Sequence, residues 1–209
     1  MIKAVLFDVD GVLIDSFDAN HKFVTELLDK FGYSFMEKDA YSNYFNYAMR
    51  DIIAHSTNLT DEEEINRIWQ AAKDRVVPYP YELIKTPENL EEILKTLKAK
   101  YSLGIVTSRS HSGIFSIPHL DALKEYFSLA VGYEDTKEHK PDAAPLLFAA
   151  EKLGVKPEEC VYIGDMVTDA QAAKAAGMKS ITYSKKEQKI SDANTSDFFK
   201  LPLIIEGLS

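Results

Sequence analysis

An apolar run at the N-terminus constrains the fold of this chain most. The run extends from Ile2 to Leu13, and among its later residues only Asp8, Asp10 and Gly11 interrupt it. Such a run is typical of a central parallel strand, because a strand covered on both faces need not alternate apolar with polar residues. Side chains along a strand point to opposite faces in turn, so Asp8 and Asp10 project the same way at its carboxyl end. The sequence therefore predicts two neighbouring acids where α/β proteins bind their ligands.

The composition narrows the class of protein. Of the 209 residues, 45% are hydrophobic and 27% are charged, which fits a globular protein with a substantial core. No apolar run reaches bilayer length and no secretory signal is evident, so we expect a cytoplasmic protein without membrane contact. The lone Cys160 excludes an intramolecular disulfide. The net charge of −9 argues against binding to nucleic acid, which needs a basic surface.

The order of predicted elements indicates a doubly wound α/β fold interrupted by helices. Residues 16–86 show helical patterns and no strand pattern, and prolines near residue 80 mark the end of this insertion. Beyond it, helices alternate with short apolar strands, which is typical of a parallel sheet. We expect a core domain of residues 1–15 and 87–209 and an all-helical domain of residues 16–86. Later strands are predicted at 101–106, 129–132, 160–163 and 180–183, helices at 87–100, 119–127, 145–153, 168–176 and 201–208, and a loop at 184–196.

Polar side chains follow three of the predicted strands. Because the carboxyl ends of parallel strands lie at one edge of a sheet, we expect these side chains to converge there. A helix-capping role explains any single acid in such a place, but it does not explain the whole set. The set consists of Asp8 and Asp10, of Thr107 and Ser108, of Asp165 with Asp169 four residues later, and of Lys140, which stands before Pro141 in a loop.

The clustering of acids predicts a bound cation. Like charges about 4 Å apart repel by roughly 4 kcal/mol at an effective dielectric constant near 20, so several carboxylates need compensation to share one site. Oxygen ligands with open water positions favour Mg²⁺. Lys140 adds positive charge, and Thr107 and the amides near Ser108 can bind phosphate oxygens. A carboxylate, a second acid, a metal and a lysine together fit phosphoryl transfer through an aspartyl phosphate.

Four motifs, in this order along the chain, resemble those of the haloacid dehalogenase superfamily of hydrolases. They are Asp-Val-Asp-Gly-Val-Leu from Asp8, Val-Thr-Ser ending at Ser108, His-Lys-Pro-Asp from His139, and Gly-Asp-Met-Val-Thr-Asp from Gly164. The helical insertion is similar to the cap of the phosphoglycolate phosphatase and β-phosphoglucomutase branch. The resemblance implies a Rossmann-like core with an inserted helical cap. It further implies a Mg²⁺-dependent phosphatase that acts on a small phosphorylated metabolite, with no protein partner.

The resemblance also implies a role for each matching residue. Asp8 would be the nucleophile, and Asp10 the general acid that later activates water. The presence of an acid at Asp10 favours a phosphatase over a dehalogenase, because a leaving alkoxide needs a proton and a halide does not. Mg²⁺ would be held by Asp8, the backbone carbonyl of Asp10 and Asp165, with Asp169 supporting the site, and the transferring phosphoryl group would be bound by Thr107, Ser108 and Lys140.

Two arginines are further candidates for binding the substrate, and two other functions stay open. The arginines are Arg50 in the helical insertion and Arg109 directly after Ser108. A sugar phosphomutase is one alternative, since His21 lies close to a histidine of the mutase cap, although Asn20 can be the aligned residue. A receiver-type signalling domain, which also handles an aspartyl phosphate, is the other. The Asp-x-Asp-Gly pattern and the large insertion argue against a receiver.

Overall fold

A computed structural model describes residues 1–45, 47 and 49–209 of the protein. The chain divides into two compact units, Met1–Asp15 with Lys85–Ser209, and Ser16–Ile84. We call them the core unit and the helical unit. The chain leaves the core unit after Asp15 and returns to it at Lys85. The backbones of these two residues exchange N–H···O hydrogen bonds of 2.8 and 3.1 Å.

The core unit is built on a parallel sheet. In the described residues it has six strands in the order β3-β2-β1-β4-β5-β6, and every neighbouring pair is parallel. Because β1 lies between β2 and β4 and is buried along its whole length, the N-terminal run needs no polar face. The doubly wound fold predicted from the sequence is confirmed. The strands are β1 (Ala4–Phe7), β2 (Ser102–Val106), β3 (Leu129–Val131), β4 (Cys160–Gly164), β5 (Lys179–Tyr183) and β6 (Ala193–Thr195).

Strand β6 lies in the segment 184–196, for which the sequence predicts a loop. Residues 193–195 read Ala-Asn-Thr and are all half-buried, so they lack the apolar run that marks a buried strand. As the outermost strand, β6 pairs with β5 alone. An edge strand with one neighbour can therefore form from polar residues that give no hydrophobic signal.

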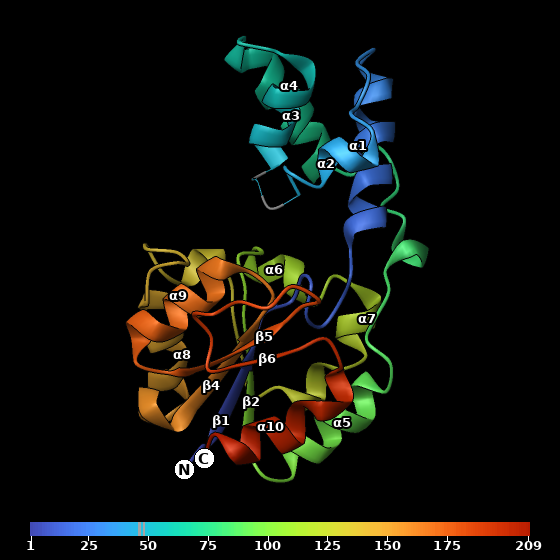
Figure 1. Ribbon diagram of the computed structural model, residues 1–209. Coiled ribbons are helices and arrows are strands. Elements are labelled where there is room, and N and C mark those ends of the chain that lie inside the picture. The colour runs from blue at the N-terminus through green and yellow to red at the C-terminus, as the bar shows by residue number, and fades with distance from the viewer. Residues whose placement is uncertain (46, 48) are drawn as a thin grey trace. The chain divides into compact units, whose positions relative to one another are not determined.

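Helices cover both faces of the sheet (Figure 1). Helices α8 and α9 pack on one face, against β2 to β5, and α5 and α10 pack together on the other. The segment predicted as one helix at 119–127 forms the short α7 followed by a 3₁₀ turn at Lys124–Tyr126. The core helices are α5 (Leu90–Lys98), α6 (His111–Ile114), α7 (Pro118–Asp121), α8 (Ala144–Leu153), α9 (Val167–Ala176) and α10 (Leu201–Gly207).

The helical unit has a hydrophobic core of its own. In its described residues, Phe23, Leu27, Ile53 and Ile68 are among the side chains that pack together inside it. Asp61 caps α4 by accepting a 3.0 Å hydrogen bond from the amide of Glu63. The helices of this unit are α1 (Phe17–Lys30), α2 (Lys38–Tyr41), α3 (Met49–Thr57) and α4 (Glu62–Lys73), followed by a 3₁₀ turn at Tyr81–Leu83.

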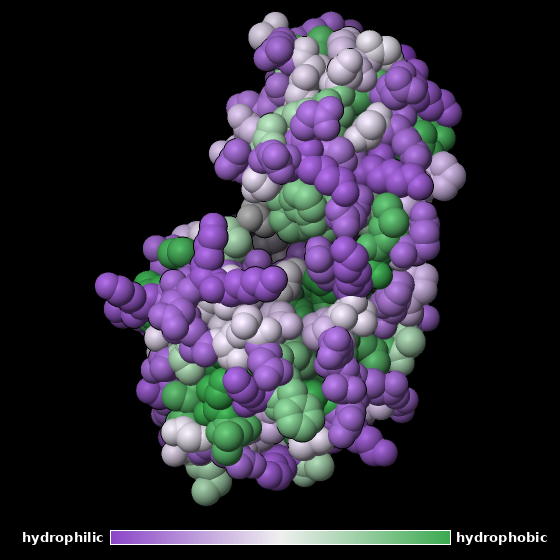
Figure 2. Space-filling model, turned by 45° about the vertical axis from the view of Figure 1, so that its right-hand side comes forward, coloured by the Kyte–Doolittle hydropathy of each residue, from purple (hydrophilic) through white to green (hydrophobic). Residues whose placement is uncertain are grey.

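On the face drawn in Figure 2, hydrophilic side chains predominate and surround smaller hydrophobic patches. Among the described residues, no helix combines the length and the apolar character needed to cross a bilayer.

Candidate active site

Three strand ends place polar side chains at one edge of the sheet. Asp8 follows β1, Thr107 follows β2 and Asp165 follows β4. Phe7 at the end of β1 lies level with Ile105 of β2 and Ile163 of β4, so the three strands end within one residue of one another. Asp8 and Thr107 are buried, and Asp165 is half-buried. The edge is therefore partly closed to solvent and can hold a small polar ligand.

Three acids converge at this edge. Asp8, Asp165 and Asp169 each offer a carboxylate oxygen, and these oxygens all lie within 4.8 Å of one another. Two glycines leave room for this approach. A Cβ on Gly164 would lie 2.3 Å from the Cβ of Asp169, and one on Gly11 would lie 2.3 Å from Oδ2 of Asp165. Gly11 also has a φ of +77°, which other residues rarely adopt.

Lys140 is the buried positive charge among these acids. Its side chain is 6% exposed, and its ammonium lies 3.1 Å from Oδ2 of Asp8 and 2.7 Å from Oδ1 of Asp169. It also donates to the hydroxyl of Tyr162 at 2.8 Å. An ammonium has three N–H donors, so these three acceptors engage the whole group. Lys140 is thus held in place against the carboxylate of Asp8.

The raised pKa values of Asp8 and Asp165 show that the site opposes ionisation of its acids. Burial raises the pKa of Asp8 to about 6, against the ammonium of Lys140, which lowers it. Burial, with the neighbouring charges of Asp8 and Asp169, raises the pKa of Asp165 to about 8. Burial opposes the charge on Lys140, but the carboxylates of Asp8 and Asp169 prevail and raise its pKa. One ammonium therefore does not neutralise the three acids.

The donor set fits a hard divalent cation. The available groups are carboxylate oxygens, which Mg²⁺ prefers, and the surplus negative charge is what such an ion would compensate. Asp169 already uses both oxygens, since Oδ1 accepts from Lys140 and Oδ2 accepts from the amide of Met166 at the start of α9. Asp165 is therefore better placed than Asp169 to contact the ion, and Asp169 is placed to hold Lys140.

Asp10 is not one of the three converging acids, and an arginine holds its carboxylate. Nε of Arg109 donates to Oδ2 of Asp10 at 2.6 Å, and Nη2 donates to Oδ1 at 2.7 Å. Both residues are partly buried. This paired geometry is the strongest form of an arginine–carboxylate contact. The sequence predicts Arg109 as a ligand of the substrate, and in the structure its guanidinium contacts the carboxylate of Asp10.

The two residues between β2 and Arg109 differ in exposure. Thr107 is buried, its amide donates to the carbonyl of Val131 at 3.0 Å, and its hydroxyl accepts from the amide of Arg109 at 3.3 Å. Ser108 is exposed. Thr107 therefore has a fixed backbone next to Asp8, whereas Ser108 faces solvent.

Arg50, the other predicted substrate ligand, belongs to the helical unit. It forms an ion pair with Glu62, and its Nε donates to Oδ1 of Asn66 at 3.2 Å. The structure thus shows Arg50 engaged with α4 of its own unit.

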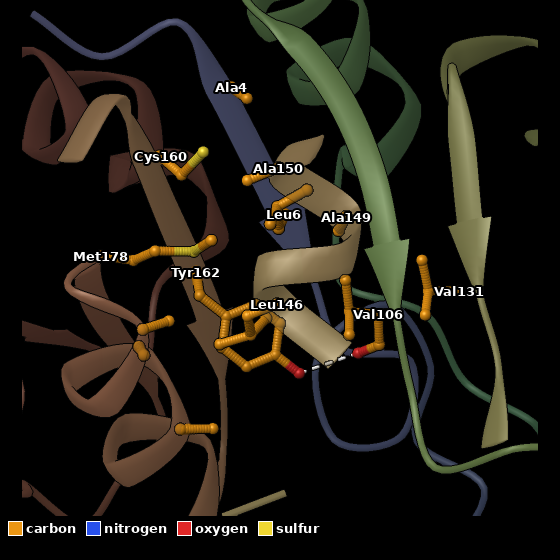
Figure 3. Close-up of a cluster of buried hydrophobic side chains, with 13 residues drawn as sticks. Ala4, Leu6, Val106, Val131, Leu146, Ala149, Ala150, Cys160, Tyr162 and Met178 are labelled. Carbon is orange, nitrogen blue, oxygen red and sulfur yellow. Dashed lines mark hydrogen bonds between the residues drawn. The ribbon is translucent and has the colours of Figure 1, made fainter. Parts of the chain in front are cut away.

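Tyr162 is a site residue that sequence reasoning missed. Its ring lies among Leu6, Leu146 and Val106 in the buried cluster of Figure 3, so it resembles an ordinary core residue. Its hydroxyl accepts from Lys140 and donates to the carbonyl of Val106 at 2.8 Å, just before Thr107. Tyr162 therefore joins β4, β2 and the loop of Lys140. The only signal in the sequence is a phenol in the strand that leads to Asp165.

Gln188 is a second residue that sequence reasoning missed. It lies in the segment between β5 and β6, and its side-chain amide donates to the carbonyl of Asp165 at 2.9 Å. Asn194 of β6 fixes the backbone of Gln188, accepting from its amide at 2.7 Å and donating to its carbonyl at 3.2 Å. The unexpected edge strand thus supports the loop that carries Asp165.

A cavity within the core unit adjoins Asp165. It has a volume of about 400 Å³ and is lined by Asp165, Gly11, Lys85, Tyr183 and Lys185, among others. The fold and the site together therefore define an α/β enzyme. It binds its ligand at acids near the carboxyl ends of the strands, next to a cavity.

The comparisons with known proteins agree with this class. The family model for haloacid dehalogenase-like hydrolases matches residues 5–183. A Clostridium perfringens protein named "Putative pyrophosphatase PpaX" is 32% identical over all of this chain and 97% of its own. The phosphoglycolate phosphatase of Chromobacterium violaceum is 26% identical over 86% of this chain and 84% of its own. A solved hydrolase of subfamily IA from Geobacter sulfurreducens aligns with a TM-score of 0.78 at 28% identity, over 100% and 97% of the two chains.

The chain belongs to the haloacid dehalogenase-like hydrolase family. It is an enzyme of the phosphoric monoester hydrolase class.

Proposed function

We propose that this chain is a Mg²⁺-dependent phosphatase that hydrolyses a small phosphorylated metabolite through an aspartyl phosphate on Asp8. The observation that carries the proposal is the convergence of Asp8, Asp165 and Asp169 around Lys140 at the carboxyl edge of the sheet. Two relatives, named as a pyrophosphatase and a phosphoglycolate phosphatase, support small phosphorylated compounds as the substrate class. Cys160 is buried in β4 and is the single cysteine, which is consistent with a cytoplasmic location.

The first half of the proposed reaction transfers the phosphoryl group to the enzyme. A carboxylate oxygen of Asp8 forms a bond to phosphorus while the bond from phosphorus to the ester oxygen breaks. The leaving oxygen takes a proton from Asp10 and departs as an alcohol. Asp8 is oriented for this attack, because Oδ1 accepts from the amide of Val9 at 2.8 Å and Oδ2 contacts Lys140.

The second half returns the enzyme to its starting state. Asp10, now a carboxylate, takes a proton from a water molecule as the water oxygen bonds to phosphorus. The bond from phosphorus to Asp8 then breaks, and inorganic phosphate is released. When bound at Asp8, the carbonyl of Asp10 and Asp165, Mg²⁺ supplies charge compensation for the acids and the phosphoryl oxygens. We assign Thr107, Ser108 and Lys140 to binding the phosphoryl oxygens, and the helical unit to covering the site as a cap.

Two residues of α1 favour a phosphatase over a phosphomutase. A mutase-type histidine must be able to reach the substrate. Here Nε2 of His21 lies 2.9 Å from the carbonyl of Met36, and its ring packs against Phe35 and Tyr41. Asn20 donates to the hydroxyl of Ser16 at 3.2 Å and accepts from the hydroxyl of Tyr79 at 2.5 Å.

Membership of this family argues against a receiver-type signalling domain, because the family model that matches the chain describes hydrolases.

The experiment that tests the proposal is release of inorganic phosphate from a panel of phosphorylated metabolites with Mg²⁺. We expect Asp8→Asn to abolish turnover, because a carboxamide is a poor nucleophile, while the fold is kept. Asp121→Asn, at an exposed position on α7, is the matched control and should retain activity. Equal turnover by the wild type and Asp8→Asn would remove Asp8 from the mechanism.

A further inference from the structure

The contact between Arg109 and Asp10 has a consequence for the choice of substrate, provided that the proposed function holds. Asp10 must reach the leaving oxygen to give it a proton. In the structure the guanidinium of Arg109 engages both carboxylate oxygens, at 2.6 and 2.7 Å. To act as the acid, Asp10 must carry a proton on one of these two oxygens and present it to the leaving oxygen, which competes with the hydrogen bond that Arg109 makes there.

Hydrogen bonds hold the backbone of Arg109, so its side chain alone has to move when the guanidinium leaves Asp10. The carbonyl of Arg109 accepts from the amide of Tyr133 at 2.7 Å, and its amide donates to the hydroxyl of Thr107 at 3.3 Å. A Cβ on Gly132 would lie 3.0 Å from the same carbonyl, which shows how tightly this turn is packed. The side chains of Arg109 and Asp10 are 23% and 28% exposed, so a ligand can approach them.

Giving up the contact with Asp10 leaves a partly buried guanidinium without its carboxylate partner. That loss is unfavourable, and a neutral group on the substrate compensates for it poorly. A carboxylate or a second phosphate compensates for it well, because each matches the planar donors of arginine. Since the leaving oxygen contacts Asp10, an anionic group one or two bonds beyond that oxygen lies within reach of Arg109.

We infer that Arg109 selects substrates whose leaving group carries an anionic group close to the scissile bond, and that this anion replaces Asp10 as the partner of the guanidinium. Binding of the right substrate thereby frees the general acid. A phosphate ester with a neutral leaving group leaves Arg109 on Asp10 and reacts slowly. Arg109 is therefore a specificity-determining residue of this site.

Matched pairs of substrates test the inference. 2-Phosphoglycolate and 2-phosphoglycolamide have nearly the same shape and differ by one negative charge, and 2-phosphoglycerate and its amide form a second pair. We expect the wild type to cleave the carboxylate of a pair with a kcat/KM at least about tenfold above that of its amide, as the loss of a charged hydrogen bond predicts. In Arg109→Gln the ratio of the two kcat/KM values should fall toward one. The carboxylate substrate loses its charged contact with the guanidinium, whereas the amide substrate has no such contact to lose.

Two further variants distinguish substrate selection by Arg109 from a purely structural role of this residue. Arg109→Lys keeps the charge but not the planar fork, and should give an intermediate ratio. Arg67→Gln is the matched control. Arg67 forms the same two-point contact with Glu64 on the surface of α4, at 2.7 and 2.6 Å, and its loss should leave the ratio unchanged.

The outcomes distinguish this inference from the proposed function. A wild type that releases phosphate from these esters or from p-nitrophenyl phosphate, but cleaves amides as fast as carboxylates, overturns the inference and leaves the phosphatase intact. An Arg109→Gln variant that slows both members of a pair equally overturns it as well. Failure to release phosphate from any ester with Mg²⁺ overturns the proposed function, and this inference with it.

Discussion

At the scale of the residue, Lys140 organises the charge of the site. One ammonium contacts the carboxylates of Asp8 and Asp169 and the hydroxyl of Tyr162. The position of Lys140 before a proline suggested a ligand role, but the sequence does not reveal its three partners. The pairing of Arg109 with Asp10, 99 positions apart, is equally invisible in the sequence, because it depends on how two turns face each other.

Removal of the Tyr162 hydroxyl tests the support of Lys140. We expect Tyr162→Phe to lower kcat about tenfold, because Lys140 loses one of its three acceptors. The ring stays in the core, so the free energy of unfolding should fall by only about 1 kcal/mol. Steady-state kinetics and urea unfolding measure the two effects. Tyr126→Phe removes a hydroxyl that binds Glu91 at the surface and should change neither, and a Tyr162→Phe enzyme with normal kcat contradicts the assignment.

The raised pKa values predict how pH affects the stability of the metal-free protein. The pKa values of Asp8 and Asp165 rise from 3.8 to about 6 and about 8 on folding, so between about pH 4 and pH 8 the folded state binds more protons than the unfolded state. The stability that these groups contribute is therefore present below pH 4 and is lost as pH rises through 6 and then 8. Thermal unfolding in EDTA across this range should show the loss.

Magnesium should reverse this trend, because a divalent cation stabilises the ionised carboxylates. The increase in Tm on adding Mg²⁺ should therefore be larger at pH 8 than at pH 5. Asp165→Asn should reduce both the pH dependence and the effect of Mg²⁺. An effect of Mg²⁺ that is the same at both pH values, and the same in this variant, contradicts the description of the site.

At the scale of the element, the carboxyl edge of the sheet was predictable and its support was not. Apolar runs ending in polar residues revealed β1, β2 and β4, and parallel pairing brings their ends together. The short β6 was missed, because the sequence Ala-Asn-Thr has no hydrophobic pattern. One side chain of β6, Asn194, hydrogen-bonds to the backbone of Gln188. The side chain of Gln188 in turn donates to the carbonyl of Asp165.

Asn194→Ala tests whether β6 supports the metal ligand. Without this side chain the loop of Gln188 loosens, and we expect the dissociation constant of Mg²⁺ to rise about tenfold, as is usual when a partner of a metal ligand is lost. Isothermal titration calorimetry with Mg²⁺ alone measures this directly. Lys189→Ala, at an exposed position next to Gln188, is the control and should bind Mg²⁺ normally. Unchanged affinity in Asn194→Ala would show that β6 has no such role.

At the scale of the whole molecule, each unit has its own hydrophobic core. Leu6, Leu146 and Tyr162 belong to a buried cluster of the core unit, whereas Leu27 and Ile68 belong to one of the helical unit. The sequence predicts a helical insertion at residues 16–86, because the strand pattern is absent there and resumes after it. Separate cores are expected of parts that can fold independently.

Excision of the helical unit tests this independence. Asp15 and Lys85 pair through their backbones, so a short Gly-Ser turn can replace Ser16–Ile84 without moving either residue. We expect the shortened protein to unfold cooperatively and to bind Mg²⁺, as measured by circular dichroism and calorimetry. It should cleave p-nitrophenyl phosphate while losing preference among natural esters, since the cap that we propose is gone. Loss of cooperative unfolding would contradict the independence of the core unit.

The most direct test of the account is to locate the phosphoryl group on the enzyme during turnover. Asp10→Asn lacks the base that activates water, so we expect an acyl phosphate to accumulate after brief exposure to acetyl phosphate with Mg²⁺. Borohydride reduces an aspartyl phosphate to homoserine with loss of phosphate, so peptide mass spectrometry should find homoserine in place of Asp8. Modification of any other residue, or phosphate release by the wild type with no trapped species in this variant, would contradict the account.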